Sequence, residues 1–121
     1  MNQSKIGKIS KHLSMVLERP DLAEKDVFLG SSNIMHMKSS HPQDYLLYHS
    51  YIQEIVFSPD YACINSKDGS IELVKEFKIG LEYVKLAIRL SSSGTLYARS
   101  LYRLNNNRVK NFIAKGTLKK V

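Results

Sequence analysis

Apolar side chains recur every three to four residues in the first half of the chain and alternate with polar side chains in the second half. The first pattern is typical of amphipathic helices and the second of strands with one buried face. The helical part predicts helices over about 9–18, from a cap at Ser31 or Ser32 to about Ser39, and from Gln43 to about Val56, with an extended segment at 27–29. The alternating part predicts strands over about 61–65, 70–77, 82–90 and 95–103.

The connections between these elements indicate how they are arranged. Lys67-Asp68-Gly69 predicts a turn between the first two strands, and residues 91–94 predict a hairpin loop with Gly94 in the left-handed conformation. Asn105 can cap a last helix that Gly116 ends. The predicted hairpin register pairs Leu90 with Leu96, Ile88 with Ala98, Leu86 with Ser100 and Val84 with Tyr102. The predicted fold class is α+β: a single domain over residues 1–121 with N-terminal helices packed on a four-stranded antiparallel meander and a closing C-terminal helix.

Polar residues interrupt the alternation of two strands. Lys75 falls in the register of Ile71 and Leu73, and Ser100 and Tyr102 fall in the register of the apolar residues before them. A buried, unpaired ammonium is costly, so Lys75 either extends its stem to an edge of the sheet or lines a polar site where helix meets sheet. Both explanations are open at this point.

Charge is the extreme feature of the composition. Eighteen Lys and Arg against eleven Asp and Glu give the 121-residue chain a formal net charge of +7. From Lys85 onward there are nine Lys and Arg and no Asp or Glu, which favours a polyanionic partner on the C-terminal half; a charge surplus that serves solubility is the alternative. We expect no membrane span and no secretion signal. The lone Cys63 excludes an internal disulfide and a cysteine-based zinc cluster, and it is expected to be a buried strand residue.

The outer face of the predicted C-terminal hairpin combines cations with aromatic rings. Its members are Tyr83, Lys85, Arg89, Tyr97, Arg99 and Arg103. Cations neutralise phosphates and rings stack on unpaired bases, so this face is a candidate RNA-binding surface. A solvated outer face would also be polar, but the absence of an acidic residue within this set favours nucleic acid.

Two of the four histidines lie close together in sequence. His36 and His41 are five residues apart, or about 140° around a helix, whereas two zinc ligands on a helix are normally four apart. We therefore expect no metal site and no cofactor. A histidine can donate and accept protons near neutral pH, which makes this pair a candidate for acid–base chemistry, although lone histidines are more often structural.

Several short segments follow one another in a recognisable order. They are Lys5-Ile6-Gly7-Lys8-Ile9-Ser10, the pair His36 and His41, Ser58-Pro59-Asp60-Tyr61, Ser70-Ile71-Glu72-Leu73-Val74-Lys75, Leu96-Tyr97-Ala98-Arg99-Ser100-Leu101-Tyr102 and Lys115-Gly116-Thr117-Leu118-Lys119-Lys120-Val121. This order resembles the phage-associated branch of the barnase–EndoU–colicin–RelE-like (BECR) nuclease superfamily. The resemblance covers nearly the whole chain. It implies N-terminal helices against a curved antiparallel sheet, in a small RNA-cleaving domain that needs no metal.

Carried over by position, the resemblance implies a set of site residues. His36 would be a general acid or base, and His41 would orient it or share the proton transfer. Lys75 would stabilise charge on the phosphate oxygens, and Ser100 would bond the phosphate. Tyr102, which shares the register of Ser100, is a further candidate to bond the phosphate.

Two further residues, Lys38 and Arg103, would be additional phosphate contacts. Ser40, where relatives often have a basic residue, and Arg99, a large cation before the hydroxyl residue, depart from the family pattern.

The expected function is a toxin-type endoribonuclease that cleaves RNA, with tRNA as one candidate, through attack of the 2′-hydroxyl on the adjacent phosphorus. The alternative is a non-catalytic RNA- or DNA-binding module that uses the basic hairpin face at 83–103; a protein-interaction domain is the third hypothesis. Many relatives are toxins neutralised by a dedicated protein, so an immunity or antitoxin protein is a candidate partner. The expected location is the cytoplasm of the producing or the target bacterial cell.

Overall fold

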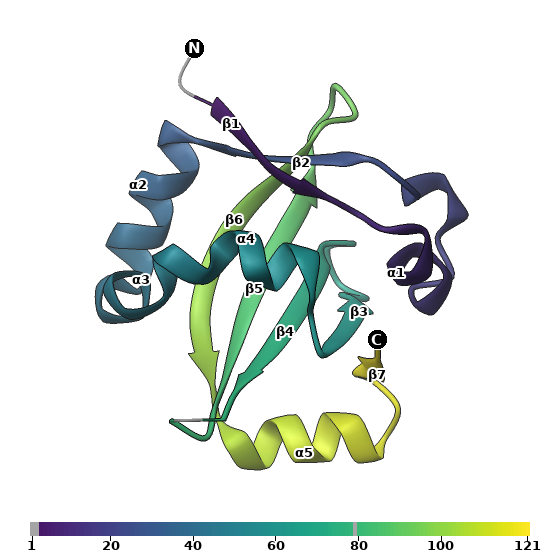
Figure 1. Cartoon of the computed structure of the whole chain (residues 1–121), viewed down its shortest axis with the longest axis vertical. Coiled ribbons are helices and arrows are strands. Elements are labelled where there is room, and N and C mark those ends of the chain that lie inside the picture. Colours follow the sequence, from purple (N-terminus) through teal and green to yellow (C-terminus); the bar gives the residue numbers. More distant parts are fainter. Residues whose placement is uncertain (1–2, 79) are drawn as a thin grey trace.

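A mixed sheet of seven strands forms the centre of the described residues, 3–78 and 80–121, in the computed structural model (Figure 1). The strands are ordered β1-β2-β6-β5-β4-β3-β7 across the sheet. Their bounds are β1 Gln3–Lys8, β2 Asp26–Gly30, β3 Tyr61–Ile64, β4 Ile71–Phe77, β5 Glu82–Leu90, β6 Leu96–Leu104 and β7 Lys119–Lys120. Neighbouring strands are antiparallel except β2 and β6, which run parallel.

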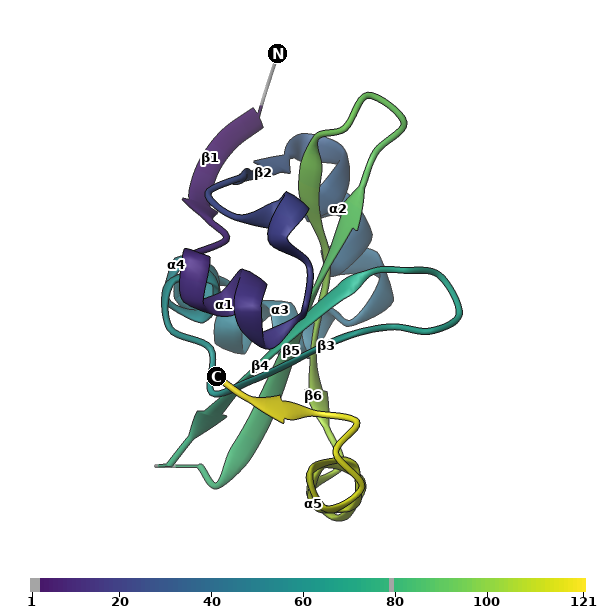
Figure 2. The same ribbon diagram turned by 90° about the vertical axis from the view of Figure 1, so that its right-hand side faces the viewer.

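Helices pack on both faces of this sheet. Their bounds are α1 Lys11–Val16, α2 Ser31–Ser40, α3 Pro42–Tyr48, α4 Ile52–Phe57 and α5 Asn106–Ala114, with short 3₁₀ turns at Pro20–Leu22 and His49–Tyr51. α1 and α4 lie on one side of the sheet, whereas α5 lies across the end of β6 on the other side (Figure 2). Within residues 3–78 and 80–121, no helix has the length and apolar character that crossing a membrane requires.

Each face of the sheet has its own hydrophobic core. The larger core lies under α1–α4 and includes Ile9, Ile55 and Leu73, which are fully buried. The smaller core lies under α5 and includes Val74 and Val109. We call the first side the inner face and the second the α5 face. The fold is therefore mixed α+β, as the sequence predicts, but with two covered faces instead of one.

Several predicted elements differ from the observed ones. The sheet is larger than a four-stranded meander, because β1, β2 and β7 extend it at both edges. The helix predicted over 9–18 begins at Lys11, where the Ser10 hydroxyl caps it by accepting the Leu13 N–H at 3.0 Å. The helix predicted over 43–56 is interrupted by the 3₁₀ turn and becomes α3 and α4. Asn105 caps α5 as predicted.

A β-bulge in β6 changes the direction in which its second half points. β5 and β6 pair in the predicted register only as far as Ala98. There the register shifts, and Arg99 is the extra residue of the bulge. Leu101, rather than Ser100, then enters the larger core, so the predicted pairings of Ser100 and Tyr102 are wrong.

The bulge also places two predicted site residues on opposite faces. Val74 belongs to the smaller core on the α5 face, and Leu73 belongs to the larger core on the inner face. Because side chains alternate along a strand, Lys75 lies on the inner face with Leu73. Ser100 alternates with Leu101 and therefore lies on the α5 face. The expectation that Lys75 and Ser100 share one side of the sheet is wrong, because a bulge inverts every side chain that follows it in the strand.

Gly7 is the residue at which β1 bends onto α4, and it yields a stability prediction. Its φ is +154°, the register of β1 shifts beside it, and a Cβ built on it would lie 2.8 Å from a methyl of the buried Val56. We expect Gly7→Ala to lower the free energy of unfolding by about 2–4 kcal/mol, because backbone strain and overpacking add. Urea unfolding monitored by circular dichroism measures the change.

A second glycine variant is the matched control. Gly69 also has a positive φ, of +74°, but nothing lies within 4 Å of a Cβ built there. Gly69→Ala should therefore cost only the backbone term of about 1–2 kcal/mol. Equal losses in the two variants would show that α4 does not pack closely on Gly7.

Candidate active site

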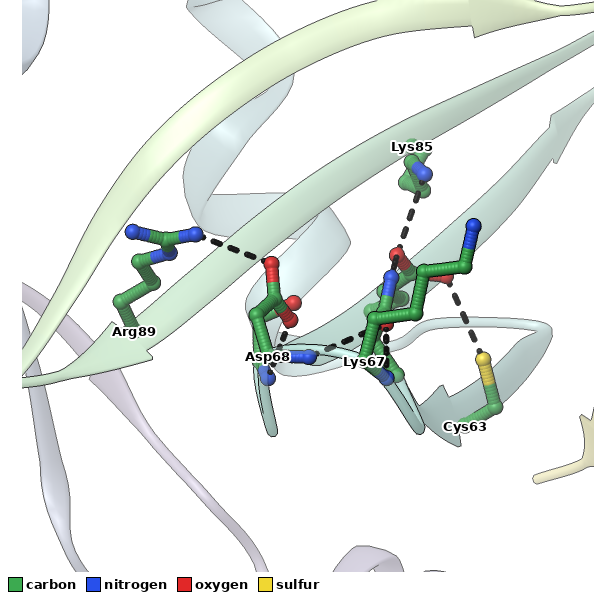
Figure 3. Close-up of polar contacts among 8 residues, drawn as sticks. Cys63, Lys67, Asp68, Lys85 and Arg89 are labelled. Atoms are coloured by element: carbon green, nitrogen blue, oxygen red, sulfur yellow. Dashed lines mark hydrogen bonds and ion pairs between the residues drawn. The ribbon is translucent and has the colours of Figure 1, made fainter.

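A half-buried carboxylate on β4 is the centre of a polar cluster on the α5 face. One oxygen of Glu72, Oε2, accepts the Lys85 ammonium at 3.2 Å and the Asn65 amide at 3.0 Å, and the Cys63 thiol donates to Oε1 at 3.4 Å. Figure 3 shows Lys85 and Cys63 reaching this carboxylate from different strands. Only 13% of the Lys85 side chain and 15% of the Glu72 side chain are exposed. The cluster thus holds an ion pair in a recess of the sheet.

Two aromatic contacts connect this ion pair to the helical layer. The Lys85 ammonium lies 4.8 Å from the centre of the Tyr102 ring on β6. The His41 ring, at the corner between α2 and α3, is stacked on the same tyrosine, with ring centres 4.5 Å apart and an angle of 25° between the planes. The contacts therefore run without a break from Glu72 through Lys85 and Tyr102 to His41.

A pocket of about 630 Å³ opens beside the cluster, between the sheet and α5. Glu72, Lys85 and Tyr102 line one part of it. Two further cationic side chains, Lys67 and Arg108, line it as well, and Arg103 borders it with its guanidinium paired to Asp44 and Glu82. Glu72 is the one acidic residue in this lining, so the pocket as described suits an anionic ligand.

The surroundings set the protonation of two groups in the pocket. Burial opposes the charge of Lys85, but the hydrogen bond to Tyr102 and the attraction of Glu72 outweigh it and raise the pKa of this lysine. Burial, reinforced by the negative charge of Glu72, raises the pKa of the Cys63 thiol to about 12. Lys85 is therefore a cation and Cys63 a neutral thiol at physiological pH.

Asp44, in the first turn of α3, holds the His41 corner against the sheet. β2 pairs with β6 only at Leu96 and Tyr97, so the backbone of Arg103 has no strand partner on that side. The Asp44 carboxylate takes the place of a strand: it accepts the Arg103 backbone N–H at 3.0 Å and the guanidinium Nε at 2.6 Å. Because Arg103 directly follows Tyr102, this contact fixes His41 over the tyrosine ring.

A second set of contacts anchors the same arginine from β5. The Arg103 guanidinium also pairs with Glu82 at 3.0 Å, and the Tyr48 hydroxyl donates to that carboxylate. Burial and the hydrogen bond to Glu82 raise the pKa of Tyr48 to about 12, so this tyrosine remains a neutral donor. Arg103 is thus held by carboxylates from α3 and β5 and is not free for a phosphate contact without losing one of them.

The predicted catalytic residues are divided between separate places. His41 and Tyr102 are in direct contact, and Ser100 lies on the same face of β6 as Tyr102. Lys75 lies on the inner face, where its ammonium donates to the Ser58 carbonyl at the end of α4 at 2.7 Å. His36 is half-buried on α2, with its ring 3.5 Å from the Ser40 hydroxyl. Lys75 therefore belongs to a fold contact, apart from the Glu72 cluster.

The predicted RNA-binding face is only partly formed, and three of its four cations have acidic partners. Lys85 pairs with Glu72 and Arg89 pairs with Asp68 at 2.9 Å. Arg103 points to the inner face because of the bulge. The premise that this set has no compensating acid is wrong, since the acids come from β4 and the turn before it.

The remaining members of the predicted surface lie outside the pocket. Tyr97 donates to the Gln3 side chain at 2.9 Å, and Arg99 is exposed at the bulge. Lys38 is exposed on α2, with its ammonium 5.6 Å from the Tyr45 ring centre.

Two residues of the site were not predicted from the sequence. Glu72 could have been found, because it alternates with buried residues and shares the α5 face of β4 with Val74. Asp44 carries no local signal, since its role depends on a strand edge 59 residues away in sequence. Among residues 3–78 and 80–121, His, Cys, Asp and Glu form no cluster that could hold a metal ion.

Comparison with protein families gives one match. Residues 4–111 match the family model described as phage-Barnase-EndoU-ColicinE5/D-RelE like nuclease 3. Neither the curated proteins nor the solved structures contain a match to the chain.

The Cys63–Glu72 contact can be tested by thiol reactivity. Cys63 is the single cysteine of the chain, and a thiol whose pKa lies near 12 contains little thiolate at pH 8. Ellman's reagent should react about 10²–10³ times more slowly with the folded than with the urea-unfolded protein. Glu72→Gln removes the negative charge and should accelerate the reaction severalfold, whereas Glu76→Gln on the same strand should not. Equal rates in both variants would contradict the contact.

The role of Asp44 can be tested without any activity assay. Asp44→Ala leaves the Arg103 backbone N–H and Nε without their acceptor, although the guanidinium keeps Glu82, and this should cost about 1–3 kcal/mol of unfolding free energy. It should also release His41 from Tyr102, so that the ring-current shift of the His41 protons in NMR spectra disappears. The control is Asp21→Ala, which removes an exposed pair with Arg19 and should leave this shift unchanged. An unchanged His41 resonance in Asp44→Ala would show that contacts other than Asp44 hold the histidine over Tyr102.

Proposed function

This chain belongs to the phage-Barnase-EndoU-ColicinE5/D-RelE like nuclease 3 family, and we propose that it is a metal-independent endoribonuclease whose active centre is the Glu72–Lys85–Tyr102–His41 cluster. The observation that carries the proposal is the continuous set of contacts among these side chains, of which Glu72, Lys85 and Tyr102 line the large pocket and His41 lines the neighbouring one at the start of α3. A carboxylate, a cation and a histidine are the groups that phosphodiester cleavage by an internal nucleophile requires.

The proposed reaction is attack of the ribose 2′-hydroxyl on the adjacent phosphorus. Glu72 accepts the hydroxyl proton through Oε1, which has only the weak Cys63 thiol as its partner. The bond from O2′ to phosphorus forms while the bond from phosphorus to O5′ breaks. The departing O5′ takes a proton from the His41 imidazolium, which leaves a 2′,3′-cyclic phosphate and a 5′-hydroxyl.

Lys85 supplies the positive charge in this mechanism. Negative charge grows on the non-bridging phosphate oxygens in the transition state, and a fixed ammonium in a recess stabilises it more strongly than one in water. The raised pKa of Lys85 keeps that charge in place. This side chain can do the work that a metal ion does in other nucleases, which supports the proposal of metal independence.

RNA specificity and the biological role are further parts of the proposal. RNA specificity follows from the proposed nucleophile, because DNA has no 2′-hydroxyl that could attack the phosphorus. A toxin role, with an immunity or antitoxin protein as partner, is supported only by the family resemblance.

Cleavage of total RNA in EDTA tests the proposal. The wild-type protein should cut RNA in the presence of the chelator, and a 2′-deoxy substitution at the cleaved nucleotide should block the reaction. Glu72→Gln, Lys85→Met and His41→Ala should each reduce the cleavage rate by about 10²-fold or more. The matched control is Lys75→Met, which removes a lysine from the inner face of the same sheet and should keep near wild-type activity.

Other outcomes would identify what is wrong. Activity that EDTA abolishes and magnesium restores would contradict metal independence. RNA binding without cleavage by the wild-type protein would favour the non-catalytic binding module. A large loss in Lys75→Met, with Lys85→Met active, would move the active centre to the inner face.

A further inference from the structure

The pocket beside the active centre extends well beyond the groups that the proposed reaction uses. Its floor is the α5 face of the sheet, and its opposite wall is formed by the first two turns of α5. Val109 is the fully buried contact of this helix with the sheet, and Phe112 is only partly buried against the smaller core. The helix thus borders a pocket of about 630 Å³, which is within the range of small-molecule sites.

The chemistry of the pocket changes from one part to the other. Glu72, Lys85 and Tyr102 make one part polar, whereas Phe112, Leu104 and Leu118 make another part apolar. The Arg108 guanidinium lies 5.8 Å from the centre of the Phe112 ring, so a cation and an aromatic ring adjoin on the α5 side. A ligand that fits both parts has an anionic group joined to a flat, largely apolar group.

We propose that the α5 side of this pocket, with Phe112 and Arg108, binds one unstacked nucleobase of the RNA whose phosphate lies at Lys85. The inference rests on the proposed function for the position of the phosphate. A base offers a flat π surface that stacks on an aromatic ring or a guanidinium plane. Lys67 and Arg108, the cations that line the pocket beside Lys85, favour binding of the polyanionic backbone. The proposed base is unpaired, because stacking on a side-chain ring requires a base that has left its own stack.

The assignment explains features of α5 that packing alone does not require. Phe112 and the exposed Arg108 both line the pocket, because residues four apart lie on the same face of a helix. Asn105 caps the helix by accepting the Arg108 N–H at 3.1 Å, which fixes the backbone from which Arg108 extends. In this proposal α5 therefore supplies the base contact, while the sheet and the corner between α2 and α3 supply the reacting groups.

NMR titration with small nucleotides tests this assignment independently of cleavage. The four nucleoside 3′-monophosphates are compared with ribose 5-phosphate, which has the phosphate and the sugar but no base. At least one nucleotide should bind about tenfold more tightly than ribose 5-phosphate and should shift the backbone amides of residues 105–113. Phe112→Leu, which keeps an apolar side chain at this position, should remove most of that tenfold difference.

A second phenylalanine in a helix provides the control. Phe57, at the end of α4, is 88% exposed and does not line the pocket. Phe57→Leu should bind the nucleotides as the wild-type protein does. The wild-type comparison with ribose 5-phosphate decides the question even where Phe112→Leu does not fold.

The outcomes separate this inference from the proposed function. Equal affinities for nucleotides and ribose 5-phosphate, no binding of either probe, or shifts that avoid α5 would each overturn the base site. Cleavage of RNA together with any of these results would leave the endoribonuclease proposal standing alone. Tight nucleotide binding at α5 by a protein that does not cleave RNA would retain the base site and reject the cleavage.

Discussion

Leu73, Leu86 and Leu101 form a row across three neighbouring strands, and all three are fully inaccessible to solvent. β6 contributes to this row only because the bulge at Arg99 inserts one residue between the two buried positions Ala98 and Leu101. Without it, the second half of the strand would expose Leu101 and place polar groups in the larger core. The demand for a continuous core therefore decides that Tyr102 faces away from α1–α4, and the candidate active centre lies on the α5 face for that reason.

The Glu72–Lys85 pair is difficult to explain by stability. Removing two charges from water costs several kcal/mol for each ion, and apolar residues of similar volume often replace such pairs without loss. The cost is offset here because Asn65 and Cys63 also bind the carboxylate, and among the described residues no buried polar side-chain atom lacks a partner. A charged pair kept in a recess beside an open pocket is typical of functional sites, and the proposed reaction gives it such a role.

The sequence predicts local features of this protein better than its pairings. The α+β class, the buried Cys63 and the left-handed Gly94 follow from composition, alternation and turn residues, and the structure confirms them. The bulge left one trace, a spacing of three between the apolar residues Ala98 and Leu101, where an uninterrupted strand has two. A single spacing of three does not reveal a bulge, because a regular strand with Leu101 on its exposed face would have the same sequence.

The site shows the same limit. His41, Tyr102 and Lys85 were singled out by residue type, but their mutual contacts depend on the bulge and on the corner between α2 and α3. Residue type alone equally favoured Lys75, which the structure assigns to a contact with the end of α4. Which of two lysines meets a carboxylate is decided by strand register, and register is a property of the pairing rather than of either strand.

The arrangement divides rigid and variable parts of the proposed site between different elements. Glu72 and Lys85 lie on β4 and β5, which are paired with a strand on both sides, and Tyr102 lies on the neighbouring strand β6. Side chains on paired strands are held more precisely than side chains on loops. His41 is supplied by the corner between α2 and α3, whereas the pocket wall on α5 packs through Val109 on the smaller core of β3, β4 and β5. In the proposed site, a substitution at the exposed Arg108 of α5 would change the base contact and leave the charged pair in place, because that pair lies on β4 and β5.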